Sequence, residues 1–326
     1  MLKKAQTSLI SAYSVAKMTV GTEKKTGNIQ NGGKMANAAS WQDLYPFESH
    51  WLDLDGIRYH YLDEGPEHAP SLLMLHGNPT WSFYYRTLIP ALSQRYRVIV
   101  PDHVGCGLSD KPQIYSYTLS QHIENLERLV ARLDLANITL ALHDWGGAIG
   151  MGYATRYPQN VARFVIFNTA AFYQPALPLR IKMCRLPLLG ALAIQGFNGF
   201  ARLALRWATS HPERLSPAVR AGYLAPYNNW HNRIALLRFV QDIPLEKRHK
   251  SRGTLDEIEA RLSLLAQHPM LIVWGDDDFC FTTRDFLPEW QKRFPEAVVH
   301  IVEDAGHYVV EDAHQRILPW IQGFLP

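Results

Sequence analysis

Cysteine is scarce in this sequence of 326 residues, and its placement excludes two kinds of architecture. Cys106, Cys184 and Cys280 are odd in number and far apart, so they predict neither a disulfide framework nor a zinc site. A chain without disulfides is typical of a reducing compartment, and we expect a cytoplasmic protein. We expect no bound metal and no other cofactor.

Long apolar runs are also lacking. No run approaches the roughly 18 residues that a membrane-spanning helix needs. The N-terminal segment MLKKAQTSLISAYSVAKM has a lysine pair, but Gln, Thr and Ser interrupt the apolar stretch after it, so a signal peptide is not expected. The lysine-rich and glycine-rich composition that follows predicts a disordered tail over residues 1–44.

Acidic residues are nearly absent from the first 35 positions, which carry six lysines and only Glu23. This segment therefore has a charge of +5, and the rest of the chain has −2 within the total of +3. A protein that binds nucleic acid usually presents a basic face, so a mildly acidic body gives no support for a nucleic-acid partner.

From Trp51 onward, strand patterns alternate with helix patterns. WLDLDGIRYHYLDEG predicts a hairpin around Asp55-Gly56, because polar and apolar residues alternate on both sides of this turn. Apolar residues over 118–135 recur at helical spacing, and Thr118 or Ser120 could cap the start of that helix. Short buried strands are expected at 71–77, 96–102, 138–144, 161–169 and 268–278. This order predicts an α/β fold with a mostly parallel sheet covered by helices on both faces.

Residues 173–266 contain no strand pattern and are rich in Leu, Ala, Pro and Arg. They predict a helical cap inserted between two parts of the core, 45–172 and 267–326. The cap arginines, which we expect to form a solvated face, are Arg180, Arg185, Arg202 and Arg206. Because the apolar stretch LPLLGALAIQGFNGF lies beside them, contact of the cap with a membrane or a protein is a further possibility, as it is for the tail.

The segment LALHDWGGAIG carries the chemistry. It reads as a strand, a sharp turn at Asp144 and a helix start, and Gly146 and Gly147 allow the turn to be tight. Asp278 follows a later strand, and His307 lies in a later loop. A nucleophile, an acid and a histidine in this chain order are typical of the α/β-hydrolase fold, so we predict these three as catalytic residues.

A carboxylate at the elbow selects a particular reaction. It is already ionised at pH 7 and can displace a leaving group from saturated carbon, giving an ester on Asp144. His307 then activates water to hydrolyse the ester, and Asp278 orients His307. Asn78, after the first parallel strand, and Trp145, beside the nucleophile, supply neutral N–H donors for a departing halide or an oxyanion.

With these motifs the chain resembles the haloalkane dehalogenase family of α/β-hydrolases over roughly residues 45–326. The similarity is strongest in HGNPTWSFYYR, VPDHVGCGLSDKP, HDWGGAIG and DAGHYVVED. The resemblance implies Asp144 as nucleophile, His307 as base, and Asn78 with Trp145 as the halide site. Some members place the acid after the strand before the cap, where this chain has Asn168. Others place it where Asp278 stands, with Asp276 and Asp277 as close neighbours.

The resemblance leaves three activities open for a small hydrophobic substrate. The main prediction is hydrolysis of haloalkanes with water to alcohol and halide. The same subfamily resembles the β-lactone decarboxylases of long-chain olefin biosynthesis, which share the aspartate, histidine and asparagine-tryptophan set. Epoxide hydrolases use a similar triad with two cap tyrosines, and Tyr173, Tyr223 and Tyr227 are available for that role. Asn78 argues against an epoxide hydrolase. A catalytically inactive receptor is disfavoured by the complete triad. His76, His143, His103 and Cys106 are expected to pack in the core.

Overall fold

A mostly parallel sheet runs through the protein, and it is described here in a computed structural model that covers residues 40–326. The expected tail lies outside the described residues up to position 39. The strand order is β1-β2-β4-β3-β5-β6-β7-β8, with β1–β2 and β2–β4 antiparallel and the other pairs parallel. The strands are β1 (His50–Asp53), β2 (Arg58–Glu64), β3 (Ser71–Leu75), β4 (Arg97–Pro101), β5 (Ile138–Asp144), β6 (Val161–Thr169), β7 (Met270–Gly275) and β8 (Val298–Val302).

Helices cover the two faces of the sheet, because alternate residues of the central strands point to opposite sides. Leu140 and Leu142 of β5 pack with α2 (Leu119–Arg132), α3 (Trp145–Arg156) and α9 (Arg252–Arg261). Ala141 packs on the other side, in the cluster that holds α1 (Ile89–Leu92) and α11 (Val309–Phe324). All seven residues of β5 are buried, and this explains why its sequence is an apolar run without alternation. Thr118, one of the two expected caps, accepts the backbone N–H of Gln121 and begins α2.

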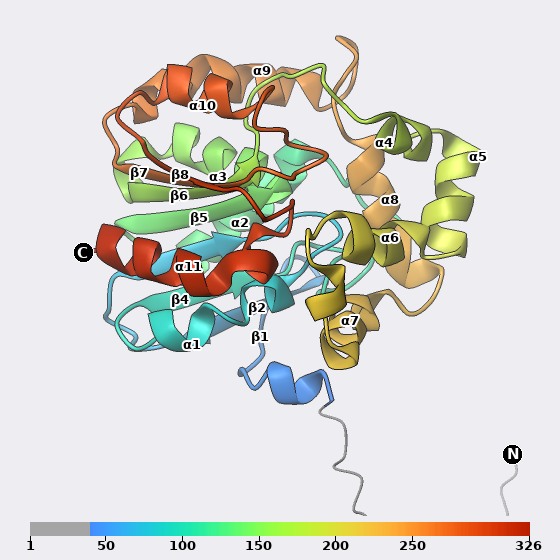
Figure 1. The fold of residues 1–326 in the computed structure, drawn as a ribbon, viewed down its shortest axis with the longest axis horizontal. Coiled ribbons are helices and arrows are strands. Elements are labelled where there is room, and N and C mark those ends of the chain that lie inside the picture. The colour runs from blue at the N-terminus through green and yellow to red at the C-terminus, as the bar shows by residue number, and fades with distance from the viewer. Residues whose placement is uncertain (1–39) are drawn as a thin grey trace, which may run out of the picture. The chain divides into compact units, whose positions relative to one another are not determined.

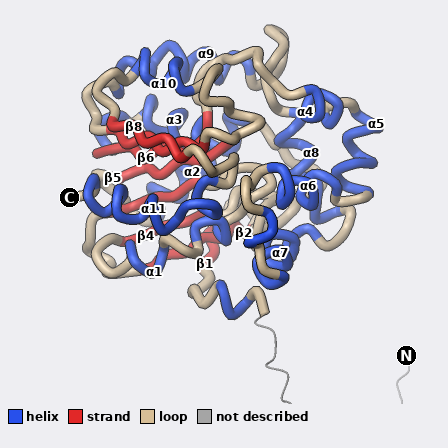
Figure 2. The backbone as a smooth tube through the Cα atoms, viewed as in Figure 1, coloured by secondary structure: helices blue, strands red, loops and turns tan. Residues whose placement is uncertain are grey.

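The cap is helical, as the sequence predicts, and it is inserted between β6 and β7 (Figure 1; Figure 2). Its elements are α4 (Leu179–Cys184), α5 (Pro187–Gly190), the π-helix η4 (Ala191–Gly196), α6 (Gly199–Trp207), η5 (Pro212–Arg214), α7 (Pro217–Leu224), η6 (Ala225–Tyr227), η7 (His231–Arg233) and α8 (Ile234–Gln241). The chain then returns to the sheet through α9 and η8 (Leu262–Leu265). Because α9 packs against α2 and α3, the end of the expected cap segment 173–266 covers the sheet.

Two further boundaries differ from the sequence expectation. By sequence, residues 40–44 belong to the expected tail, but Gln42–Leu44 form the 3-10 helix η1. The ring of Trp41 packs edge-on against Trp81, and the ring of Tyr45 packs against Trp81 at a tilt. The stretch SFYYRTLIPALSQ after β3, which by sequence is expected to form one helix, is divided into η2 (Ser82–Tyr85) and α1. The remaining short elements are η3 (Pro158–Asn160) and α10 (Leu287–Arg293).

Candidate active site

Asp144 occupies a strained turn between β5 and α3. Its φ of +50° and ψ of −123° lie outside the regions that L-residues prefer, so the surrounding packing must hold this conformation. Gly146 and Gly147 make the turn possible, because a Cβ at either position would overlap Leu75 O or Thr169 Oγ1. A Cβ on Gly77 would overlap the Asp144 carboxylate itself. The elbow predicted from LALHDWGGAIG therefore places this carboxylate above the carboxyl edge of the sheet.

The Asp144 carboxylate is almost fully buried and has a donor on each side. The backbone N–H of Asn78 donates to Oδ1 at 2.6 Å, and Nε2 of His307 lies 3.6 Å from Oδ2. Burial raises the pKa of Asp144, but the contact with His307, the neighbouring His143 and the Asn78 N–H together lower it below its ordinary value. Asp144 is therefore ionised at neutral pH and one oxygen faces the cavity, as a carboxylate nucleophile requires.

His307 lies in the loop between β8 and α11 and contacts two carboxylates. Its Nδ1 is 2.8 Å from Asp278 Oδ2, and the ring of Phe281 stacks on the imidazole with centroids 5.5 Å apart. Burial lowers the pKa of His307, but the charges and contacts of Asp278 and Asp144 outweigh burial and raise it to about 10. Asp278 and Asp144 therefore both favour the protonated form of His307.

Asp278, rather than its neighbours, is the carboxylate that reaches His307. Its Oδ1 accepts the backbone N–H groups of Cys280 and Phe281 at 2.6 and 3.0 Å, so the side chain is fixed. Asp277 instead accepts the exposed Ser210 hydroxyl at 3.0 Å. The structure thus brings Asp144, His307 and Asp278 together in the arrangement expected from their order in the chain.

Asn168 is a site residue whose contribution the sequence did not reveal. The sequence shows only that an acid is absent at this position. In the structure its amide Nδ2 donates to Asp278 Oδ2 at 3.0 Å and to the Gly275 carbonyl at 3.0 Å, while its Oδ1 accepts the Gly275 N–H at 2.8 Å. A polar residue at the end of the buried strand β6 was the available signal. Asn168 joins β6 to β7 and holds the acid in place.

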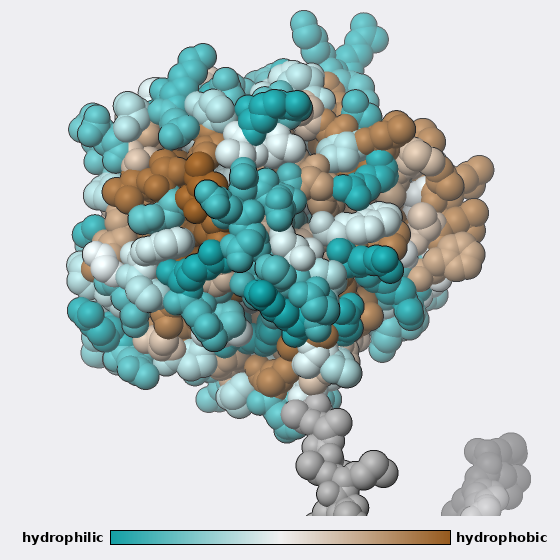
Figure 3. Space-filling view, in the orientation of Figure 1, coloured by the Kyte–Doolittle hydropathy of each residue, from teal (hydrophilic) through white to brown (hydrophobic). Residues whose placement is uncertain are grey.

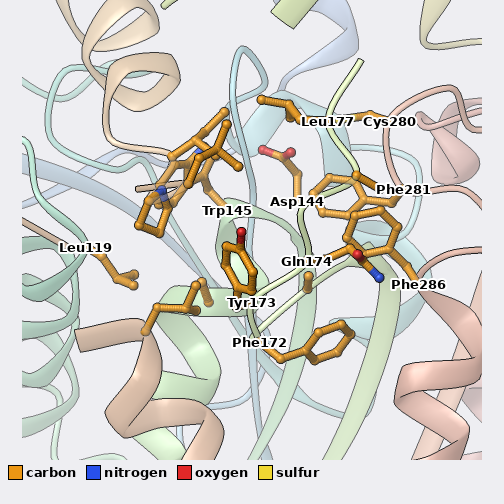
Figure 4. A pocket seen from close by; sticks show the side chains of 17 residues that line it. Leu119, Asp144, Trp145, Phe172, Tyr173, Gln174, Leu177, Cys280, Phe281 and Phe286 are labelled. Carbon is orange, nitrogen blue, oxygen red and sulfur yellow. The ribbon is translucent and has the colours of Figure 1, made fainter. Parts of the chain in front are cut away.

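Asn78 and Trp145 both line the cavity beside Asp144. The Asn78 side chain donates to the Leu236 carbonyl of α8 at 3.2 Å, which uses one of its two amide hydrogens. Within residues 40–326, no acceptor takes the Trp145 indole N–H, and the ring packs against Phe239 at 5.2 Å between centroids. Figure 4 shows Trp145 and Asp144 side by side at the cavity. Both residues therefore retain an N–H that a ligand can accept.

Two apolar pockets meet at Asp144, and we call them the first and second arms of the cavity. Asp144, Trp145, Ile243 and Cys280 border both arms. The first arm runs between the core and the segment after β6, and its further lining includes Leu119, Phe172, Tyr173, Leu177, Leu255 and Phe286 (Figure 4). The second arm runs under α4 and α6, and its further lining includes Ile181, Phe200, Leu203, Ala204, Trp207 and Val240. The Asp144 carboxylate therefore lies at the junction of the two apolar arms.

The remaining candidates take structural positions. His76, His103, His143 and Cys106 are buried, as expected, and burial is the main cause that lowers the pKa of His143 to about 3. His143 Nε2 contacts the His307 carbonyl at 2.8 Å and thus supports the loop of the base. Arg180 departs from the expected solvated face, because its guanidinium lies 3.7 Å from the Phe279 ring centroid in the wall of the second arm.

The cap tyrosines do not form an epoxide-activating pair. Tyr223 donates to Glu311 at 2.7 Å, Tyr227 donates to the Thr80 carbonyl at 3.4 Å, and both are buried away from the cavity lining. Glu311 also forms a two-pronged ion pair with the buried Arg86, at 2.8 Å for each contact. Of the three candidate tyrosines only Tyr173 lines the cavity, so the pair of cap tyrosines that an epoxide hydrolase uses is not assembled there.

The described chain offers no metal centre. Within residues 40–326, no group of three or more His, Cys, Asp or Glu side chains is placed to hold a metal ion. The described site places the Asp144 and Asp278 carboxylates on either side of the His307 imidazole.

The sheet, the elbow and the inserted cap define a protein of the α/β-hydrolase class. The family model described as the alpha/beta hydrolase fold matches residues 70–313, and the chain belongs to that family. Within it, the chain is an enzyme of the haloalkane dehalogenase type.

Three relatives illustrate this similarity. A cis-3-alkyl-4-alkyloxetan-2-one decarboxylase of Shewanella oneidensis is 46% identical over 288 residues, covering 86% of this chain and 89% of the relative. Haloalkane dehalogenase 2 of Mycobacterium tuberculosis is 35% identical over 280 residues, covering 84% and 93%. The crystal structure of haloalkane dehalogenase DbeA from Bradyrhizobium elkani superposes with a TM-score of 0.76 at 26% identity, covering 85% of this chain and 98% of that one.

Proposed function

We propose that this enzyme decarboxylates β-lactones that carry one alkyl chain on ring carbon C3 and another on the adjacent ring carbon C4, giving an alkene and carbon dioxide. The ring is numbered from its oxygen O1 through the carbonyl carbon C2. The observation that carries the proposal is the pair of apolar arms that meet at Asp144, because such a lactone presents two chains from one reacting ring. The higher identity to a relative named for this substrate than to the named dehalogenase supports it.

The catalytic residues suit a cycle that consumes no water. Asp144 attacks ring carbon C4, the C4–O1 bond breaks, and the product is an alkyl ester of Asp144 with a free carboxylate on C3. The electron pair of the C2–C3 bond then forms the C3=C4 double bond, carbon dioxide leaves, and the Asp144 carboxylate is expelled and restored. Attack inverts C4, so the two groups that leave are opposite one another, and a cis lactone gives a cis alkene.

His307 and the two N–H donors act on the charge that develops in this cycle. The imidazolium, held protonated by Asp278 and Asp144, keeps a positive charge beside the carboxylate that attacks C4 and is later expelled. Asn78 and Trp145 offer further donors to the carboxylate that forms on C3, where a pre-oriented donor is most effective. We further propose a cytoplasmic location, because Cys106, Cys184 and Cys280 without disulfide partners suit a reducing compartment.

Hydrolysis of haloalkanes is the second candidate activity, and the free indole N–H of Trp145 favours it. Asp144 would displace a halide that Asn78 and Trp145 bind, forming a neutral alkyl ester. Loss of the Asp144 charge removes one of the two carboxylates that raise the pKa of His307, so this residue can release its proton and accept one from water. Water would cleave the ester, giving the alcohol and restoring Asp144.

The deciding experiment compares a cis-3,4-dialkyl β-lactone with a bromoalkane on one enzyme preparation, measuring alkene, hydroxy acid and bromide. We expect kcat/KM for the lactone to exceed that for the best bromoalkane by about a thousandfold, a difference of about 4 kcal/mol in transition-state stabilisation. The alkene should appear without hydroxy acid. A bromoalkane that reacts as fast as the lactone would overturn the assignment in favour of dehalogenation.

A matched pair of variants tests the two arms. Ala176→Phe fills the first arm and Ala204→Phe fills the second. We expect each variant to lose activity on lactones with a long chain at one ring position and to keep activity when that chain is a methyl group, with opposite positions affected in the two variants. If both variants reject the same ring position, the two arms do not hold the two chains.

A further inference from the structure

The outer side of the cap carries a concentration of exposed apolar side chains. Nine large hydrophobic residues there are between 42% and 82% exposed, and Figure 3 shows brown side chains gathered at the edge where α5 lies. We call this group the cap outer surface, and it consists of Leu179, Met183, Leu186, Leu188, Leu189, Leu192, Phe197, Leu203 and Trp207. Contiguous exposed apolar surface of this kind marks an interaction site.

Positive charge accompanies the cap outer surface. Residues 174–212 contain five arginines and lysines and no acidic residue. Arg185 pairs with Glu246, but the exposed Lys182, Arg202 and Arg206 form no ion pair with any residue in the range 40–326. A second copy of this chain would bring the same cations face to face across a twofold axis, which is unfavourable. An anionic surface is the complementary partner.

The cap outer surface is continuous with the substrate cavity. Ile181, Phe200 and Ala204 of the same helices line the second arm on their inner side. Leu203 and Trp207 belong both to the second arm and to the cap outer surface, because each lines the arm and is 42% exposed. These two residues therefore connect the wall of the second arm to the cap outer surface.

The geometry favours helices that lie on a membrane rather than cross it. Among the described helices, none is by itself long and apolar enough to cross a membrane, and the segments Pro187–Gly196 and Gly199–Trp207 pass such a test only as a pair bent by 75°. Ile194, Ala201 and Leu205 of this pair are buried against the rest of the protein. One apolar side therefore packs inward and the other is free, as in helices that bind at a membrane interface.

We infer that the cap outer surface docks on an anionic phospholipid membrane, with leucines in the acyl region, cations at the headgroups and the second arm open to the lipid. The docking stands on the cap alone, whereas the entry of a long-chain lactone from the lipid rests on the proposed function. Leucine side chains and basic residues contribute separately to such binding, so it should respond both to apolar area and to salt.

The test measures co-sedimentation of the full chain with vesicles. We expect binding to vesicles of phosphatidylglycerol and phosphatidylcholine, at least tenfold weaker binding to pure phosphatidylcholine, and weakening at 1 M salt, where the screening length falls to about 3 Å. Leu192→Glu should reduce binding at least tenfold, whereas Leu264→Glu should not, although the two leucines are 55% and 52% exposed.

Thermal unfolding and turnover of a short bromoalkane in vesicle-free buffer are the controls for folding of both variants, since neither residue lines the cavity. Equal vesicle binding by the two variants, or no binding by the parent chain, would overturn the docking surface. So would a parent chain that forms dimers in sedimentation velocity and that Leu192→Glu converts to monomers without any vesicle binding. A parent chain that binds vesicles but has no activity on the lactone would contradict the proposed function and leave the docking in place.

Discussion

Replacing Asp278 by asparagine changes one atom of the candidate triad, and the structure predicts where that atom goes. Asp278 Oδ1 accepts two backbone N–H groups, from Cys280 and Phe281, so the single carbonyl oxygen of the asparagine is held at this position. The new amide NH₂ then takes the place of Oδ2. There it faces His307 Nδ1 and the Asn168 amide Nδ2, both of which donated to the carboxylate.

This exchange reverses the hydrogen bond on the imidazole. His307 must accept at Nδ1 and carry its proton on Nε2, which faces Asp144 at 3.6 Å. A neutral imidazole in this tautomer has no lone pair with which to activate water on Asp144. The substitution also removes the strongest influence that raises the pKa of His307, so this pKa falls. A serine hydrolase loses about 10⁴-fold in kcat from the equivalent change, or roughly 5.5 kcal/mol, and we expect a similar loss for ester hydrolysis here.

Rapid-quench kinetics with a bromoalkane separates the two chemical steps. In Asp278→Asn, we expect about one equivalent of bromide per site in a burst, followed by steady-state alcohol formation about 10⁴-fold slower than in the parent enzyme. Decarboxylation of the lactone, which consumes no water, should lose much less. Asp277→Asn is the matched control, because Asp277 contacts only the exposed Ser210 hydroxyl among the side chains near it. Steady-state turnover of Asp278→Asn within tenfold of the parent, or a crippled Asp277→Asn, would refute the assignment.

Three other predictions concern the same site. His307→Phe should accumulate a covalent alkyl ester on Asp144 after exposure to a bromoalkane, and intact mass spectrometry that finds only unmodified protein would contradict the role of Asp144. Asn78→Ala should slow the bromide burst about a hundredfold, since loss of one such donor costs about 3 kcal/mol, and bromide should quench tryptophan fluorescence in the parent enzyme. The free energy of unfolding should fall as the pH rises from about 6.5 to about 10, because the raised pKa of His307 means that folding stabilises the imidazolium, and this contribution is complete below pH 6.5. Chemical denaturation should show that the free energy of unfolding differs less between pH 7 and pH 9.5 for His307→Gln than for the parent enzyme. An equal difference in the two proteins would assign the pH dependence to other groups.

Much of the core could be predicted from the sequence because its signals are local. The apolar runs of β5 and β7, the turn at Asp55-Gly56 and the cap at Thr118 each depend on a few adjacent residues. The turn at Asp144 could be predicted equally well, since only small residues fit where Gly146 and Gly147 approach Leu75 and Thr169.

The features that the sequence did not reveal depend on contacts between distant segments. Asn168 acts through Asp278, which is 110 positions away, so its own neighbours carry no sign of this contact. The arginines of the cap look alike in sequence, yet Arg180 lies on Phe279 in the cavity wall. The forked cavity likewise forms only when α4, α6 and the segment after β6 are assembled over Asp144.

The buried ion pair of Arg86 with Glu311 has a consequence for how the protein unfolds. It joins the segment after η2 to the start of α11, four residues beyond His307, and Tyr223 adds the cap helix α7 to the same group. Tyr223 donates to the carboxylate of this pair, so separation of α7 from the core would remove a hydrogen bond from a buried charge near the loop that carries His307. Cap and core should therefore unfold together in a single cooperative transition in calorimetry. Glu311→Gln should lower that transition temperature and weaken the coupling between the unfolding of the cap and that of the core.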